Sequence, residues 1–217
     1  MKKLSTLLII AGLLIAVYPF ANTYFEQREE ARLMGALEEQ MQPVGAEEST
    51  VEEYQALQEV FVAYEEEEQG YEAPEEMVIH EDGELLGRLE IPKIQADMPV
   101  VQGASDTNLK SAAALLDGTS SIGSIGNAAI AAHRSYTYGR FFNRLNEVEV
   151  GDLIIVTTPE AVYTYKAYEI KIVEPTDLSV LNRNSRDKVI TLITCDPIYV
   201  ATHRLIVHGV MVSEEKV

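Results

Sequence analysis

The stretch VITLITCDP at residues 189–197 carries an apolar run into the only cysteine of the chain, Cys195, and ends at a proline. A second apolar run, RLIV at residues 204–207, follows after a short interval. The two runs predict two strands joined by a short loop. Neighbouring strands lie ~4.8 Å apart, so we expect Cys195 and Arg204 to meet across the strand pair. The sequence therefore predicts a thiol beside a fixed positive charge.

The acidic residues are concentrated in one segment. Residues 26–84 contain 20 aspartates and glutamates against two arginines, and this imbalance equals the net charge of −18 of the whole chain. The remaining residues are balanced, with 15 acidic and 15 basic side chains. Because no basic patch offsets the acidic segment, we expect no nucleic-acid partner.

The N-terminus has the pattern of a membrane anchor. Two lysines precede an uncharged stretch from residue 4 to residue 25, and a helix of that length spans ~30 Å of hydrocarbon. The lysines favour a cytoplasmic N-terminus with the rest of the chain outside the cell. A cleavable signal peptide is the alternative, but Pro19-Phe20-Ala21 fits a cleavage site poorly. We expect residues 1–25 to anchor a single-pass cell-membrane protein whose other parts are extracellular.

Residues 26–83 are expected to form an acidic, partly helical stalk between the membrane and the rest of the protein. Apolar residues between 26 and 42 recur at helical spacing; they are Leu33, Met34, Leu37 and Met41. A capping box at Ser49 and Thr50 opens a second amphipathic pattern that ends before Gly70.

From residue 84 onward the sequence changes to short β-like runs. Strands are expected at 85–91, 99–101, 127–132, 152–157 and 162–173, in addition to the two runs around Cys195. The runs at 152–157 and 162–173 are expected to form a hairpin. Short helical segments are expected at 108–116 and 141–145, and a long polar connection at 174–188. About eight strands with only short helices predict an all-β barrel or sandwich over residues 84–217.

Three residues of this domain combine into one chemistry. Taken alone, Cys195 is more often a small buried apolar residue, His133 a structural histidine at a strand end, and Arg204 a surface ion-pair partner. Taken together they suit attack of a thiolate on an acyl carbon. In that reaction an acid protonates the departing amine, and a fixed cation stabilises the oxyanion.

The other histidines are weaker candidates. His203 is nearer to Cys195 in sequence than His133 is, but 203 and 204 face opposite sides if both lie on one strand. His80 and His208 are expected to be structural. No grouping of the histidines with the single cysteine has metal-ligand spacing, so we expect neither a metal nor another cofactor.

Several motifs resemble those of the sortases, the membrane-anchored cysteine transpeptidases of Gram-positive bacteria. TLITC at 191–195 with RLIV at 204–207 is similar to their cysteine signature. GNAAIAAHR at 126–134 resembles their histidine motif, with Ala132 where glycine is usual. The resemblance covers residues 84–212 in the family's order and includes LGRLEIP at 86–92, FFNRL at 141–145 and GD at 151–152.

This resemblance implies an eight-stranded β-barrel as the catalytic domain, residues 84–217. It implies that Cys195 attacks the threonine carbonyl of an LPxTG-like sorting signal and forms a thioacyl intermediate. His133 would protonate the leaving amine, and Arg204 would hold the substrate and the oxyanion. The implied partners are surface proteins or pilins that carry the signal.

The resemblance also implies an amine acceptor, either a peptidoglycan precursor such as lipid II or a pilin lysine. Thr194 and Ala132 are expected to contact the substrate, and the connection at 174–188 corresponds to the segment that shapes substrate choice. Class C sortases usually carry a lid with an aspartate-proline motif. No such pair precedes the barrel here, so class D is expected, with class C second.

Two functions of other classes remain open at this level. A surface cysteine protease would pass its acyl-enzyme to water. Papain-like enzymes place the cysteine before the histidine, whereas His133 precedes Cys195 by 62 residues, and the caspase Gln-Ala-Cys signature is missing. A non-catalytic peptide-binding module would keep its function in a Cys195→Ala variant, and a transpeptidase would lose it.

Overall fold

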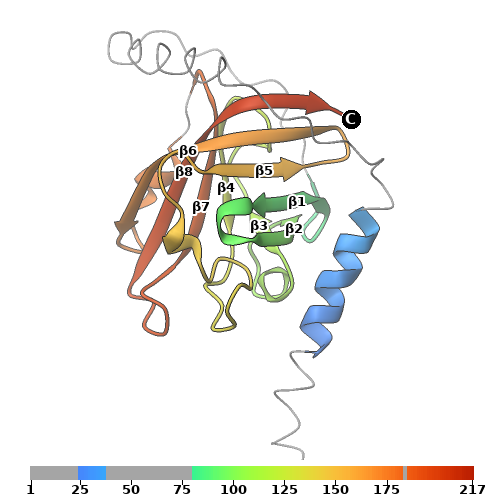
Figure 1. Cartoon of the computed structure of the whole chain (residues 1–217), viewed down its shortest axis with the longest axis vertical. Helices are drawn as coiled ribbons and strands as arrows, with labels where there is room; N and C mark the ends of the chain where they lie inside the picture. Colours follow the sequence, from blue (N-terminus) through green and yellow to red (C-terminus); the bar gives the residue numbers. More distant parts are fainter. Residues whose placement is uncertain (1–23, 38–79, 183–184) are drawn as a thin grey trace, which may run out of the picture.

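The computed structural model describes residues 24–37, 80–182 and 185–217, and in these residues eight strands close into a barrel (Figure 1). Their order around the barrel is β1-β2-β3-β4-β7-β8-β6-β5. The strands are β1 Leu85–Ile91, β2 Ala96–Gln102, β3 Ala113–Leu115, β4 Gly126–Ala131, β5 Leu153–Thr157, β6 Ala161–Val173, β7 Lys188–Asp196 and β8 His203–Lys216. The predicted eight-stranded barrel is confirmed, as is the hairpin of β5 and β6.

Short 3-10 helices occupy four of the connections in this part of the chain. They are η2 Pro92–Ile94, η3 Asn108–Lys110, η4 Leu145–Glu147 and η5 Leu178–Leu181. The last of these lies in the long connection expected at 174–188, between β6 and β7. An α-helix at 24–37 precedes the barrel.

Parallel pairing of β4 with β7 decides where the site forms. Ala131 at the end of β4 lies opposite Ile193 near the end of β7. Because parallel strands run in the same direction, the residues that follow them emerge at the same edge of the sheet. The segments that carry His133 and Cys195 therefore meet at one end of the barrel.

Alternation along the strands separates an inner face from an outer face. On β7 and β8, Ile190, Leu192, Leu205 and Val207 belong to the main core inside the barrel. Successive side chains of a strand point to opposite faces, so Cys195 and its neighbour across the pair lie on the outer face. The site is thus built on the outside of the barrel and not in its interior.

The structure differs from the prediction at both segments of the barrel domain that were expected to be helical. The segment expected to be helical at 108–116 contains the three-residue η3 and then strand β3. Ala113 pairs with Val100 of β2, and Ala114 pairs with Ala131 of β4. All three residues of β3 are buried, so pairing and burial outweigh the helix propensity of alanine.

The helical turn expected at 141–145 is also displaced. Phe141 adopts a left-handed backbone conformation with φ 49° and forms an isolated bridge with Arg134. A residue with positive φ cannot continue a right-handed helix. The 3-10 helix η4 therefore begins only at Leu145.

The helix at 24–37 packs beside β2 and β3 (Figure 1). Leu33 contacts a small outer cluster formed by Val101 of β2 with Ala112 and Ala114, and Leu37 is buried. This agrees with the helical spacing seen in the sequence after residue 26. The remainder of that pattern, the second stalk helix and most of the expected membrane anchor lie outside the described residues.

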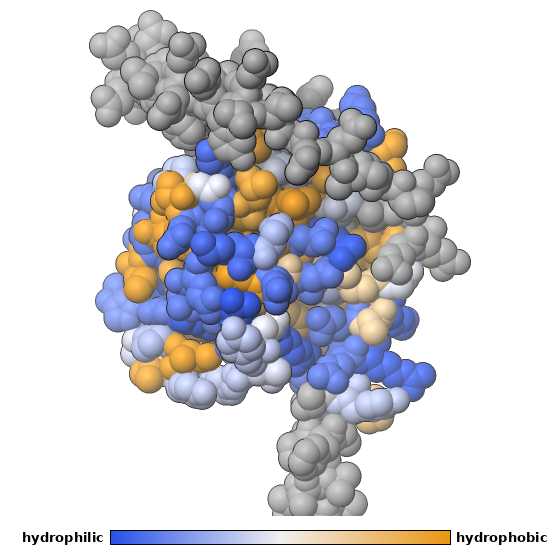
Figure 2. Space-filling model, viewed as in Figure 1, coloured by the Kyte–Doolittle hydropathy of each residue, from blue (hydrophilic) through white to orange (hydrophobic). Residues whose placement is uncertain are grey.

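In the described part of the chain, no helix has the length and apolar character needed to cross a membrane. The division into anchor, stalk and catalytic domain stays a prediction. On the face seen in Figure 2, hydrophobic residues lie in small separate groups among hydrophilic ones. This mixture is the usual outer surface of a barrel whose apolar side chains point inward.

Candidate active site

His133 and Cys195 line one pocket at the edge where β4 and β7 end. The pocket has a volume of about 340 Å³. His133 is exposed and Cys195 is partly exposed, so both groups are accessible from solvent. The other lining residues come from the helix at 24–37 and from the connections β2–β3, β4–β5 and β7–β8; they are Glu26, Lys110, Arg134, Ser135, Tyr136, Arg140, Phe141, Pro197, Ile198, Tyr199 and Ala201.

Arg204 lies directly opposite Cys195 in the antiparallel pairing of β7 with β8. Directly opposed residues share a face, with their Cβ atoms ~5 Å apart. The predicted pairing of these two positions is therefore confirmed. Nη1 of Arg204 donates to the carbonyl oxygens of His203 at 2.9 Å and Ala201 at 3.3 Å. Arg204 thus stands beside the thiol on the neighbouring strand, although it does not line the pocket itself.

The rival histidine lies on the other face. His203 pairs with Asp196 and not with Cys195, and its Nε2 lies 3.2 Å from a carboxylate oxygen of Glu174. Of the four histidines, only His133 lines this pocket within the described part of the chain. The geometry therefore favours His133 as the partner of the thiol.

Thr194 and Ala132 connect the two strands just before the site. The Thr194 hydroxyl donates to the carbonyl oxygen of Ala132 at 2.8 Å, and 2% and 5% of the two residues are exposed. The structure shows these two residues in contact with each other. Their expected role as substrate contacts stays a prediction.

Arg134 and Asp196 were not among the residues expected in the site. They form an ion pair through Nη1 of Arg134 and Oδ1 of Asp196. Nη2 of Arg134 donates to Asn146 Oδ1 at 2.9 Å. The sequence signal was present, since an arginine directly follows the histidine and an aspartate directly follows the cysteine. It could not be interpreted without knowing that β4 and β7 are neighbours.

The helix at 24–37 contributes one wall of the pocket. Glu26 lines the pocket, and its carboxylate lies 3.0 Å from Nη1 of Arg140. Glu30, one turn further along the same face of the helix, lies 3.5 Å from Nε of Arg140. Burial raises the pKa of the Glu30 carboxyl, and the nearby Arg140 charge opposes that shift. Arg140 therefore holds the helix against the loop that follows His133.

An Arg140→Gln variant is expected to loosen this helix from the barrel. The loss of two ion pairs at a half-buried guanidinium removes on the order of 1.5–3 kcal/mol of docking energy. Limited trypsin digestion of the full chain should then cleave after Arg28 and Arg32 about tenfold faster, measured by mass spectrometry. Arg144→Gln, which removes a local pair with Glu147, is the matched control. Equal cleavage rates in the two variants would contradict the docking role.

A buried polar network joins the three strands of the site to the connection between β6 and β7. The Thr191 hydroxyl donates to Asn127 Oδ1 at 2.7 Å and contacts His208 Nδ1 at 2.8 Å. The Asn127 amide donates to the carbonyl oxygens of Val180 at 3.0 Å and Asn182 at 3.3 Å. The η5 segment is thereby fixed to the outer face of β4, which leads into His133.

The network contains a titratable group with a strongly shifted pKa. Burial lowers the pKa of His208 to about 4, and the positive charge of Lys171 acts in the same direction. The unfolded chain has an ordinary histidine pKa of ~6.5 and so binds this proton more readily than the folded chain does. The contribution of His208 to the free energy of unfolding is therefore fully present above pH 6.5 and is lost as the pH falls towards 4.

We expect the melting temperature of the full chain to fall by several degrees between pH 6.5 and pH 4. A His208→Gln variant keeps a polar side chain but cannot titrate, so it should lose this part of the pH dependence. Differential scanning calorimetry over the same range measures both effects. The prediction fails if the parent and the variant show the same slope.

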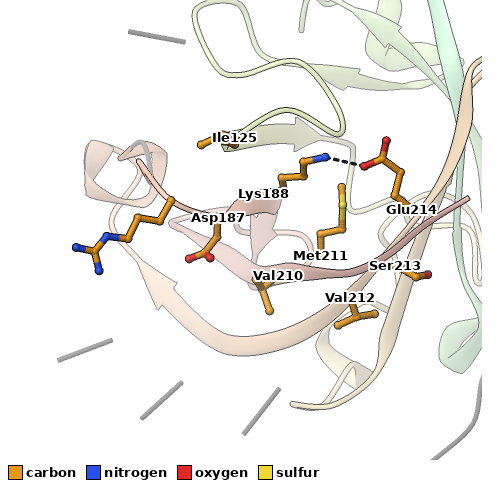
Figure 3. A pocket seen from close by; sticks show the side chains of 9 residues that line it. Ile125, Asp187, Lys188, Val210, Met211, Val212, Ser213 and Glu214 are labelled. Carbon is orange, nitrogen blue, oxygen red and sulfur yellow. Dashed lines mark hydrogen bonds and ion pairs between the residues drawn. The ribbon is translucent and has the colours of Figure 1, made fainter. Parts of the chain in front are cut away.

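A second cavity lies at the opposite end of β7 and β8 (Figure 3). It has a volume of about 410 Å³ and contains an ion pair between Lys188 and Glu214 at 2.6 Å. Lys188 begins β7, so ~23 Å of strand separates it from Cys195. No histidine or cysteine lines this cavity within the described residues. We therefore place the chemistry at the pocket of His133 and Cys195.

In residues 24–37, 80–182 and 185–217, no three or more histidine, cysteine, aspartate and glutamate side chains are grouped so that they could hold a metal ion. The pocket does contain a thiol, an imidazole and two guanidinium groups. Such a set suits nucleophilic attack by sulfur followed by proton transfer.

Residues 89–212 match the family model of the sortase domain. This match covers more than half of the chain, and the chain belongs to the sortase family. Sortase A of Listeria monocytogenes is 30% identical over 132 residues, which cover 61% of this chain and 59% of that protein. Sortase SrtE1 of Streptomyces coelicolor is 31% identical over 149 residues, covering 62% of this chain and 42% of that protein.

Sortase D of Bacillus subtilis is 30% identical over 136 residues, covering 61% of this chain and 67% of that protein. The aligned part is less than two thirds of the length of the Listeria and Streptomyces relatives.

Solved structures agree with the family assignment. The crystal structure of Listeria monocytogenes sortase A has a TM-score of 0.58 and 29% identity, covering 61% of this chain and 90% of that chain. Clostridium perfringens sortase C, solved with a C-terminal cell wall sorting motif, has a TM-score of 0.56 and 29% identity. It covers 60% of this chain and 72% of that chain. The shared part is the barrel that carries the candidate site.

Proposed function

We propose that this protein is a sortase that cleaves an LPxTG-like sorting signal and transfers the cleaved surface protein to an amine. The observation that carries the proposal is the position of Cys195. It shares one pocket with His133 and stands opposite Arg204 on the neighbouring strand. Membership of the sortase family gives this arrangement its chemical interpretation.

In the first half-reaction, the thiol proton of Cys195 passes to His133, and the resulting thiolate attacks the carbonyl carbon of the threonine in the signal. A carbon–sulfur bond forms and the carbonyl electrons move onto oxygen, where the Arg204 guanidinium stabilises the negative charge. The carbon–nitrogen bond then breaks as the tetrahedral intermediate collapses. His133 gives its proton to the departing amine, and a thioester with Cys195 remains.

In the second half-reaction, an amine replaces the departed one. The incoming amine attacks the thioester carbon, loses a proton to His133, and releases the Cys195 thiolate. The candidates for this acceptor are a peptidoglycan precursor such as lipid II and a pilin lysine. The relative solved with a cell wall sorting motif supports a peptide of that type as the first substrate.

We further propose that residues 1–25 anchor the chain in the cell membrane, with the barrel outside the cell. The uncharged stretch after Lys2 and Lys3 supports this orientation. Class D remains the preferred subclass and class C the second. Relatives named sortase A, D and E have similar identities of 30–31% to this chain, so the subclass rests on the missing lid motif.

Intact mass spectrometry of the full chain in detergent, incubated with an LPxTG-like peptide, tests the proposal. An acyl adduct on the protein that passes to added triglycine in preference to water is the expected result. Release by water alone would favour a hydrolytic cysteine protease. No adduct with any peptide of a panel would favour a binding module and would overturn the proposal.

A further inference from the structure

Each of the two candidate catalytic side chains is directly followed by a charged residue. Arg134 follows His133 and Asp196 follows Cys195. The two charged side chains form an ion pair with each other, and only 9% and 17% of these side chains are exposed. A single charged contact therefore ties the segment that carries the imidazole to the segment that carries the thiol.

The ion pair lies just beyond the point where backbone pairing stops. The register of β4 with β7 ends at Ala131 and Ile193. One further side-chain contact, from the Thr194 hydroxyl to the Ala132 carbonyl oxygen, precedes the catalytic positions. The ion pair follows them. Both catalytic residues are thus held between a hydrogen bond on one side and a charged contact on the other.

Arg134 holds more than the carboxylate. Its Nη1 donates to the backbone carbonyl oxygen of Cys195 at 3.4 Å, and its Nη2 donates to Oδ1 of Asn146 in η4 at 2.9 Å. The backbone of Arg134 forms a bridge with Phe141. A planar guanidinium presents several donors in a fixed geometry, which the single ammonium of a lysine does not. Arg134 thereby joins three neighbouring segments around the pocket, two through its side chain and one through its backbone.

This arrangement is not explained by stability. Desolvation of two charges offsets most of their attraction, and a well-packed apolar pair of similar size is often at least as stable. Nε of Arg134 is also buried without a hydrogen-bond partner in the described part of the chain, which adds a further cost. Misplacement of reacting groups by about 1 Å can lower a rate about 100-fold. Precise placement is thus the stronger reason for the pair.

We propose that Arg134 is a positioning residue that holds His133 and Cys195 in their reactive arrangement through its contacts with Asp196 and the Cys195 carbonyl. This inference rests on the proposed transpeptidase function and adds a residue to it. Arg134 acts through its neighbours and does not touch the reacting atoms. Its loss should therefore lower kcat and leave KM for the peptide unchanged.

The first test uses the full chain with both charges removed, as Arg134→Met with Asp196→Leu. Removal of both partners avoids an unpaired buried charge. We expect kcat for peptide transfer to fall by about 10- to 100-fold, with KM within twofold of the parent. Arg88→Met with Asp97→Leu removes an Arg–Asp pair between β1 and β2 and is the matched control, with kcat unchanged.

A single Arg134→Lys variant keeps the positive charge and guards against misfolding of the double variant. Because one ammonium cannot reach all three acceptors, kcat should still fall about tenfold. An unchanged kcat in both Arg134 variants would overturn the proposal. A raised KM with unchanged kcat would do the same, because it would make Arg134 a substrate contact.

A second measurement needs no peptide and so separates this inference from the proposed function. Cys195 is the only cysteine, so iodoacetamide reports on that thiol alone. In the parent, His133→Ala should change the alkylation rate of Cys195 severalfold; in the double variant it should change that rate less than twofold. Equal effects of His133→Ala in both proteins, including no effect in either, would overturn the positioning role even if peptide transfer fails for another reason.

Discussion

Replacing Cys195 with alanine is expected to abolish the acyl-enzyme and to lower peptide transfer by at least about 10⁴-fold. The chain contains one cysteine, so no second thiol can form the thioester. The pocket keeps its imidazole and its two guanidinium groups in this variant, but none of them is a comparable nucleophile. Intact mass spectrometry and chromatography of the products measure the adduct and the turnover.

The fold should survive this change, which makes the result interpretable. Cys195 is only partly buried and lies on the outer face of β7, away from the core of the barrel. The melting temperature of Cys195→Ala should therefore stay within a few degrees of the parent, and the peptide should still bind. Cys195→Ser keeps the size of the side chain, so it is the matched control for the loss of side-chain volume in Cys195→Ala. Transfer that persists in Cys195→Ala would exclude a thioacyl mechanism.

The strand pair around this cysteine was predictable because its pattern is local. Leu192 and Leu205 point into the core, and their neighbours along each strand point out. Residues 189–192 of β7 and 205–209 of β8 are buried on both faces, so each strand appears in the sequence as a nearly continuous apolar run. The short connection between the runs then left one antiparallel pairing, which places Arg204 opposite Cys195.

Contacts between distant segments were not predictable in the same way. The pairing of β4 with β7 joins segments about 60 residues apart, and no local periodicity identifies parallel partners. Glu26 and Arg140, which meet at the pocket wall, are 114 residues apart. The contact of Arg134 with Asp196 depends on the same parallel pairing. The catalytic candidates followed from residue type and motif, and the groups that support them required the tertiary structure.

The prediction of a helix in place of strand β3 was wrong for a different reason. Its sequence consists of small residues that favour helices in isolation, and the periodicity of such a short run does not separate helix from strand. In the barrel, Val101 of β2 and Ala131 of β4 lie on either side of Ala114 and supply backbone partners. Only the neighbouring strands decide the conformation of this segment.

Arg204→Ala is expected to lower kcat/KM for peptide transfer by about 10²- to 10³-fold, the usual effect of removing an oxyanion donor. Arg204 stands opposite Cys195 on β8, and in the proposed mechanism its guanidinium stabilises the negative charge that develops on the substrate oxygen during attack. Arg204→Lys should recover little of the lost rate, because an ammonium does not reproduce the fixed donor geometry of a guanidinium. Lys216→Ala, on the same strand, is the control and should leave the rate unchanged.

The division of the Arg204 effect between kcat and KM identifies what the guanidinium does. Loss of an interaction made only in the transition state lowers kcat, whereas loss of one that holds the peptide equally in both states raises KM. Arg204 contacts backbone carbonyl oxygens beside the pocket, so it must exchange these acceptors for the substrate oxygen, and we expect the larger loss in kcat. A kcat/KM within fivefold of the parent would exclude Arg204 as the stabilising cation. The charge would then have to come from another guanidinium of the pocket, such as Arg140.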